Sequence, residues 1–175
     1  VYGLNAIIWN DLISRDLLVS YDAPSWAAEV SEGLNDPNGY YYAIVKQAIV
    51  LAYDKNQVSE EDAPTDWTDL WTNEKFFGKY EASGRLTAGT TRNVIAGILS
   101  RYSDPNGELG VSDEGWEAIA AYYQHGVPNE EGVDSYAQIA NPNSPVLMCQ
   151  MWSSGVIQYD EMYGTSTGVA KPEVG

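Results

Sequence analysis

The chain has 175 residues, 44% of them hydrophobic and 12% aromatic, and its 25 acidic residues against 9 basic ones give a net charge of -16. This length fits one ordinary domain, and the aromatic content excludes a disordered chain. The charge excludes nucleic acid as a partner, because a phosphate backbone requires clustered Lys and Arg, and no stretch is long and apolar enough to cross a bilayer.

The first third of the chain predicts two helices, a turn and one or two strands. Apolar residues at helical spacing predict a helix over residues 3–16, and a Ser cap predicts a short helix over 25–30. The letters DPNG at 36–39 predict a tight turn, because Pro presets the bend and Gly tolerates unusual dihedral angles; the same letters recur at 104–107. Residues 40–53 are rich in Tyr, Ile and Val and predict one or two strands.

Strands and helices alternate in the rest of the chain. The expected elements are a short helix at residues 64–71, a strand at 84–88, helices at 90–102 and 112–126, a short helix at 135–140, a strand at 145–151 and a helix at 153–163. Thr90 and Thr91 are candidate helix caps, and Gly126 and Gly164 are candidate helix ends. The alternation predicts an α/β fold with a twisted, mixed or mostly parallel sheet flanked by helices.

Catalytic and metal-binding patterns are absent from the sequence. Cys149 and His125 are the only residues of their types, so no intrachain disulfide can form and too few ligands remain for a zinc site of the His/Cys type. Cys149 lies in an apolar run typical of a buried structural thiol, and His125 before Gly126 suits a helix end. There is no nucleophile elbow and no triad partner. We expect no catalytic residue, no metal site and no cofactor.

Residues 87–93 (TAGTTRN) carry the clearest ligand-binding chemistry. A strand that ends in a Gly turn and opens a helix leaves backbone N–H groups that favour an anion or a carbonyl oxygen. The candidate contacts in this segment are Thr87, Gly89, Thr90, Thr91 and Arg92. The alternative is that Thr90 or Thr91 only caps the helix while Arg92 faces solvent, and spacing alone favours this alternative.

Two aromatic residues complete the candidate ligand site. Tyr40 begins a run of three tyrosines that cannot all face one side of a strand, because side chains alternate. Trp152 directly follows an apolar strand, where it is either a stacking platform at a cleft or part of the core.

The order of several motifs resembles the family 1 extracellular solute-binding proteins, which have the type II periplasmic-binding fold. The most specific likeness is APTDWTDL at 63–70 followed by FGKY at 77–80, which is similar to the family's Pro-x-x-Trp-x-x-Leu run before a Gly-Lys-hydrophobic strand. Further similarity lies in residues 17–24, 39–41, 49–55 and 171–175. Ferric-ion members carry a Tyr-Tyr pair after the late strand, whereas Met151 and Trp152 stand there in this chain.

The resemblance implies a two-lobed binding protein that is not an enzyme. Residues 1–39 would be a remnant of the first lobe, 40–170 the second, ligand-gripping lobe with a crossover strand, and 171–175 the start of a return strand. The implied protein captures a small solute outside the membrane and delivers it to the permease of an ABC importer. It would be a monomer at the cell surface or in the periplasm, held by a lipid anchor. By the same likeness, residues 87–92 fall where relatives touch ligand. The alternative from composition is a fragment of a carbohydrate-active enzyme or a carbohydrate-binding domain.

Overall fold

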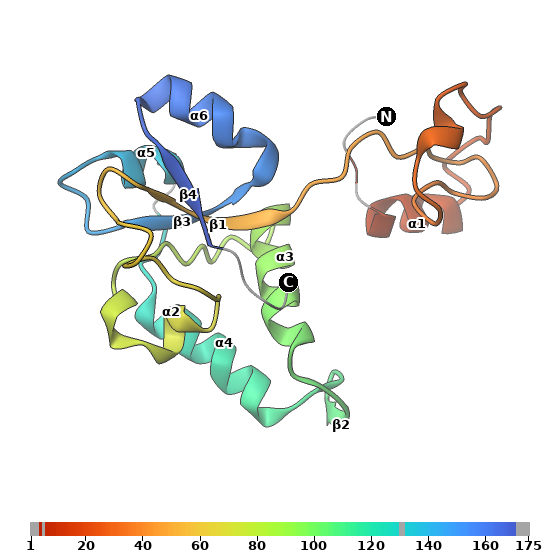
Figure 1. The fold of residues 1–175 in the computed structure, drawn as a ribbon. Coiled ribbons are helices and arrows are strands. Elements are labelled where there is room, and N and C mark those ends of the chain that lie inside the picture. The colour runs from red at the N-terminus through yellow and green to blue at the C-terminus, as the bar shows by residue number, and fades with distance from the viewer. Residues whose placement is uncertain (1–3, 5, 130–131, 171–175) are drawn as a thin grey trace. The chain divides into compact units, whose positions relative to one another are not determined.

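The computed structural model describes residues 4, 6–129 and 132–170, and the chain divides into two compact units, Val1–Lys46 and Gln47–Gly175 (Figure 1). The first unit contains α1 (Ala6–Ser14) and a short 3-10 helix, η1 (Ala27–Glu29). The expected return strand at 171–175 lies outside the described residues.

The predicted turn at 36–39 is confirmed. The N–H of Gly39 donates to the Asp36 carbonyl (3.2 Å), and Gly39 adopts a φ of 78° that favours glycine. The Asp36 carboxylate also accepts hydrogen bonds from the backbone N–H groups of Asn38 (2.8 Å) and Tyr40 (3.1 Å). Tyr40 therefore belongs to this turn, and the strand predicted over 40–53 begins only at Ile49.

The second unit holds the sheet and most of the helices. Its strands are β1 (Ile49–Asp54), β2 (Ser103–Glu108), β3 (Met148–Trp152) and β4 (Thr167–Val169). Its helices are α2 (Asp69–Thr72), η2 (Glu74–Phe76), α3 (Gly89–Ser100), α4 (Asp113–His125), α5 (Ser135–Ala140), η3 (Ser153–Gly155) and α6 (Val156–Tyr163). The predicted α/β class is confirmed, and none of the described helices is long and apolar enough to span a bilayer.

The three described strands of the sheet pair antiparallel. Their order is β3-β1-β4, and Leu51 in β1 stands opposite Gln150 in β3. Parallel pairing enters through single bridges, from Tyr80 to Met148 and from Glu81 to Val127. The expectation of a mostly parallel sheet is therefore wrong, as is the strand expected at 84–88. The chain leaves the sheet after Ala82, so this parallel segment stays short.

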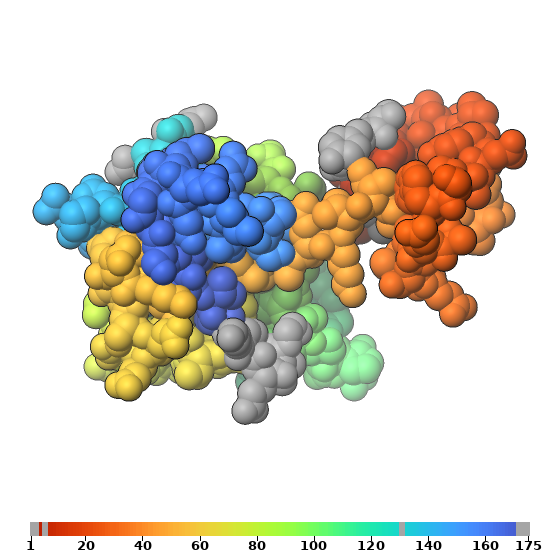
Figure 2. Space-filling model, turned by 45° about the horizontal axis from the view of Figure 1, so that its top comes forward, coloured from red at the N-terminus to blue at the C-terminus, as the bar shows by residue number. Residues whose placement is uncertain are grey.

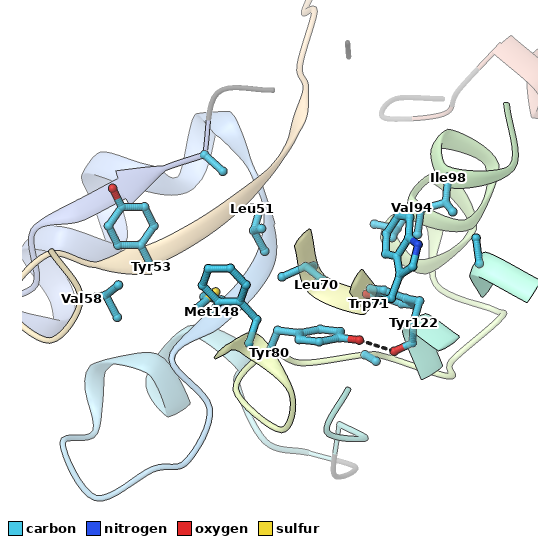
Figure 3. Packing of buried hydrophobic residues seen from close by; sticks show 14 residues of the cluster. Leu51, Tyr53, Val58, Leu70, Trp71, Tyr80, Val94, Ile98, Tyr122 and Met148 are labelled. Carbon is cyan, nitrogen blue, oxygen red and sulfur yellow. Dashed lines mark hydrogen bonds between the residues drawn. The ribbon is translucent and has the colours of Figure 1, made fainter. Parts of the chain in front are cut away.

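Alternation along β1 divides the core between the two faces of the sheet. Leu51 and Tyr53 face a cluster that includes Leu70, Tyr80, Tyr122 and Met148, packed with α2, α3 and α4 (Figure 3). Ala52 faces the opposite cluster, whose other buried members come from α5, β3 and the segment before β3. Figure 1 shows α5 and α6 on one side of the sheet and α2 and α4 on the other.

Asp54, at the end of β1, is a buried carboxylate whose hydrogen bonds are satisfied. Its Oδ1 accepts hydrogen bonds from the backbone and side-chain nitrogens of Asn56 (3.1 and 3.0 Å) and from the N–H of Ser166 (3.2 Å). The N–H of Lys55 donates to the Ser166 carbonyl (2.8 Å), so the loop after β1 and the segment after α6 lie side by side (Figure 2).

The DPNG letters at 104–107 form most of β2 and not the expected tight turn. The Asp104 carboxylate accepts from the Asn106 N–H (2.9 Å), but the chain reverses only over the next residues. The N–H of Gly110 donates to the Gly107 carbonyl (3.0 Å), and Leu109 and Gly110 adopt φ values of 53° and 79°. The same four letters thus give different structures, because the hydrogen bond between the Asp104 N–H and the Gly110 carbonyl (2.9 Å) extends the first segment.

Candidate ligand-binding site

A cavity of about 680 Å³ lies within the second unit, at the end of β3 and beside the starts of α3, α5 and α6. The parallel bridges align the segment at 80–81 with β3 and with Val127, so their carboxyl ends meet at one edge. The cavity is lined at this edge by the last residue of β3, Trp152, and by residues that follow the other two segments, Ser83 and Asn129. Ligands of open α/β sheets bind at such an edge.

The start of α3 contributes to the cavity wall through Ala88, Thr90 and Thr91. Ala88 is the residue that caps the helix, and its side chain makes no capping hydrogen bond. Thr90 and Thr91 therefore lie inside the helix. The alternative that one of them caps the helix is wrong. Thr91 is buried, and its hydroxyl donates to the Ser83 hydroxyl (3.0 Å). The first N–H groups of a helix have no partner within it, so they are available to a ligand oxygen here.

The structure brings only some of the predicted contacts to this cavity. Thr90, Thr91 and Trp152 line it, whereas Thr87, Gly89 and Arg92 lie outside the lining. Arg92 is exposed because each residue of a helix is turned by about 100° from the one before, and Thr91 already occupies the inward position. Arg85 is instead the basic residue of the wall. Tyr40 lies in the first unit, outside this cavity.

Sequence reasoning missed a buried polar group formed by Glu81, Gln150 and Tyr122. The Gln150 side-chain nitrogen donates to the Glu81 carbonyl (2.5 Å) and to the Tyr122 hydroxyl, and that hydroxyl donates to the same carbonyl (3.4 Å). Burial raises the pKa of Tyr122, and nearby Tyr123, Tyr80 and Glu81 raise it further, so the hydroxyl stays protonated. The sequence signal for this group is Glu81 itself, an acidic residue between the buried residues Tyr80 and Ala82.

Cys149 is fully buried, as predicted, and lines the cavity beside acidic groups. Burial raises the pKa of its thiol, and the Glu81 and Asp134 carboxylates raise it further. The residue therefore remains a neutral thiol, because a nucleophilic cysteine needs electropositive surroundings.

Asp134 and Tyr136 connect the cavity to the start of α5. The Asp134 carboxylate caps this helix by accepting from the N–H groups of Tyr136 (2.8 Å) and Ala137 (3.2 Å). The Tyr136 ring stacks on Tyr159 of α6 with centroids 4.8 Å apart, and both rings line the cavity. One side of the cavity is thus aromatic and is built by two helices.

Asp160 holds this aromatic wall to the strand β4. Its carboxylate accepts from the Tyr136 hydroxyl (3.2 Å), the Thr165 hydroxyl (2.8 Å) and both the N–H (3.0 Å) and the hydroxyl (2.6 Å) of Thr167. Burial acts to raise the pKa of Asp160, but the hydrogen bonds from Thr167 and Thr165 outweigh it and lower the pKa. The charged form is therefore the one that the folded chain stabilises.

We expect Asp160→Asn to lower the free energy of unfolding by about 1–2 kcal/mol at neutral pH, as the loss of charged hydrogen bonds predicts. Because the folded pKa is depressed, the stabilisation is present above the unfolded value of about 3.9 and is lost as the pH falls through the folded pKa. Urea unfolding at pH 7 and pH 3 should show the difference between variant and wild type shrinking in acid. Glu161→Gln, which removes the same charge from an exposed position of α6, is the control. An equal loss at both pH values would contradict the assignment.

Known proteins match this chain over nearly its whole length. Residues 8–175 match the family model described as bacterial extracellular solute-binding protein. The chain belongs to this family. Family members are solute-binding proteins and not enzymes, so the expectation of a non-enzyme is confirmed and the carbohydrate-active alternative is set aside. Within the described residues no group of three or more His, Cys, Asp or Glu side chains is arranged to hold a metal ion.

One curated relative is similar to this family member in sequence, and solved structures are similar to it in fold. A probable ABC transporter periplasmic-binding protein of Sinorhizobium fredii is 38% identical over 116 residues, which are 66% of this chain and 31% of that protein. Iron-bound HitA from Pseudomonas aeruginosa has a TM-score of 0.69 at 19% identity and covers 91% of this chain and 48% of its own. A ferric binding protein from Campylobacter jejuni has a TM-score of 0.63 at 20% identity, over 94% of this chain and 52% of its own. The chain thus spans about half the length of these solved relatives and under a third of the curated one.

Proposed function

We propose that this chain is the ligand-gripping part of the substrate-binding component of an ABC importer. In this role it captures a small solute outside the membrane and delivers it to the permease. The cavity at the strand ends of the second unit is the observation that carries the proposal. Its wall contains helix starts, hydrogen-bonding groups and aromatic rings, and the chain belongs to a solute-binding family. Among the contacts that the sequence predicts, we propose that Thr90, Thr91 and Trp152 touch the ligand in this cavity.

The proposed lobes follow the family's plan. Residues 1–39 belong to the first lobe, 40–170 form the second lobe with its crossover, and 171–175 begin the return. The division between compact units at Lys46 and Gln47 lies within the proposed crossover. We further propose that the intact protein is a monomer held at the cell surface or in the periplasm by a lipid anchor.

A thermal-shift screen of the intact protein tests the proposal. The protein is first unfolded and refolded during dialysis, which removes any solute that copurifies. A solute held at about 100 times its dissociation constant should then add about 2.7 kcal/mol of stability. A screen across sugars, organic acids, amines and metal ions that finds no saturable stabilisation would refute the function.

The isolated chain should bind the same solute weakly or not at all. In a two-lobed binder the second lobe supplies only part of the contacts, and closure over the ligand supplies the rest. Calorimetry on this chain and on the intact protein, with the solute found by the screen, measures the difference. Micromolar binding by this chain alone would contradict the two-lobed arrangement.

A further inference from the structure

One carboxylate oxygen in the wall of the cavity has no partner in the part of the chain that the structure describes. Glu81 is only 3% exposed, and among the described residues its Oε2 has no hydrogen-bond partner. The other described buried side-chain atom in this state, Trp116 Nε1, does not line the cavity. Buried polar groups in native proteins are nearly always paired, so an unpaired carboxylate oxygen requires an explanation.

The backbone around Glu81 fixes where its side chain lies. The Glu81 N–H donates to the Met148 carbonyl (2.9 Å), and its carbonyl accepts from Gln150 (2.5 Å). Neighbouring Tyr80 and Ala82 belong to the core cluster that packs with α4, so the Glu81 side chain projects from the opposite face of the pleat. Cys149 belongs to the cluster on that opposite face and, like Glu81, lines the cavity.

The contrast with Asp54 shows that the fold can satisfy a buried carboxylate where no ligand is expected. Asp54 is 4% exposed and receives hydrogen bonds from Asn56 and Ser166. Glu81 is as deeply buried and lines the cavity, but no described residue pairs with its Oε2. The missing donor is therefore most simply a group of the solute.

We propose that the cavity binds a small organic solute that carries a protonated amine, and that the amine donates hydrogen bonds to the Glu81 carboxylate. This inference rests on the solute-binding function proposed above and names the chemical class of the solute. Hydrogen bonds between an ammonium group and a carboxylate are charge-assisted, which makes them shorter and stronger than neutral ones. An ammonium group also compensates the negative charge that the wall otherwise holds out of water.

Other features of the cavity favour a cation. The wall also carries the acid Asp134 and the basic residue Arg85, both of them exposed, so Glu81 is the buried charged side chain of the wall. Trp152, 37% exposed, and Tyr159 supply aromatic rings, whose faces attract cations. The net charge of -16 adds a field that raises the local concentration of cations.

Three probes of equal length and different charge test the inference on the intact, ligand-stripped protein. These are 1,4-diaminobutane, 1,4-butanediol and succinate, each titrated in thermal-shift and calorimetric measurements at constant ionic strength. We expect saturable stabilisation by the diamine and none by the diol or the dianion. Stabilisation by succinate or the diol equal to that by the diamine, or no response to the diamine, overturns the inference.

The variant Glu81→Gln tests whether the diamine binds at the Glu81 carboxylate. It keeps the shape of the side chain and removes its charge, so affinity for the diamine should fall about tenfold or more. The ligand-free variant should melt at the same temperature as wild type or higher, because an unpaired buried charge is removed. Glu117→Gln, an equal charge change at an exposed position of α4 outside the cavity, should leave diamine binding unchanged.

The outcomes separate this inference from the proposed function. If Glu81→Gln binds the diamine as wild type does, the inference fails while the function stands. If the variant does not fold, the three-probe comparison on wild type decides. Stabilisation by succinate alone also sinks the inference and supports the function. The function itself fails only if the wider solute screen finds no ligand.

Discussion

Replacing Leu51 by alanine should lower the free energy of unfolding by about 2–5 kcal/mol, the cost of a cavity in a well-packed core. Leu51 is 1% exposed in β1, the central strand of the sheet. Its side chain packs in the cluster with Leu70, Tyr80 and Met148 (Figure 3), and its carbonyl accepts a hydrogen bond from the Ala170 N–H (3.0 Å). Because β3 and β4 both pair with β1, the strands around residue 51 have little freedom to move into the cavity that the substitution leaves.

Urea unfolding followed by circular dichroism measures this loss. The control is Ile157→Ala, which removes a similar side chain from a position of α6 that is 75% exposed. The control should change stability by less than about 0.5 kcal/mol. A loss below about 1 kcal/mol for Leu51→Ala would show that this part of the core is not closely packed.

Gly126→Ala should destabilise the chain by about 1–3 kcal/mol through overpacking. A Cβ at Gly126 would lie 2.3 Å from the Ala82 Cβ and 2.8 Å from Cε2 of Tyr80. The φ of Gly126 is -84°, which any residue adopts, so the cost comes from contact and not from backbone strain. Since Ala82 has no rotamer to change, the segment that carries Glu81 must shift, and solute affinity should fall as well.

Gly97→Ala is the matched control for Gly126→Ala. A Cβ at Gly97 would meet no atom within 4 Å, and the residue lies in the interior of α3. Alanine there should stabilise the chain by about 0.5–1 kcal/mol, because glycine is the poorer helix former. Thermal unfolding of both variants should therefore give shifts of opposite sign, and shifts of the same sign would contradict the packing at Gly126.

Local chemistry determined where most helices lie and some of their ends. The sequence predicted α4 between Ser112 and Gly126, and the structure has it with those residues as its caps. The predicted end of α6 at Gly164 is confirmed by a φ of 67°. The motif order predicted the solute-binding family, which the family match over residues 8–175 confirms. These features depend on residues that are neighbours in the chain, so the sequence carries them directly.

Contacts between distant residues decided the sheet and the cavity. Sequence alternation does not specify a strand's partner, so the antiparallel order β3-β1-β4 and the short strand β4 were not predicted. The hydrogen bond from Gln150 to Glu81 joins residues 69 positions apart, and the pairing of the Glu81 segment with Met148 and Val127 brings the acid to the cavity wall. Arg92 and Thr87 stand beside Thr91 and Ala88 in sequence but lie outside the wall, because helix rotation and the path of the chain select which neighbours face inward.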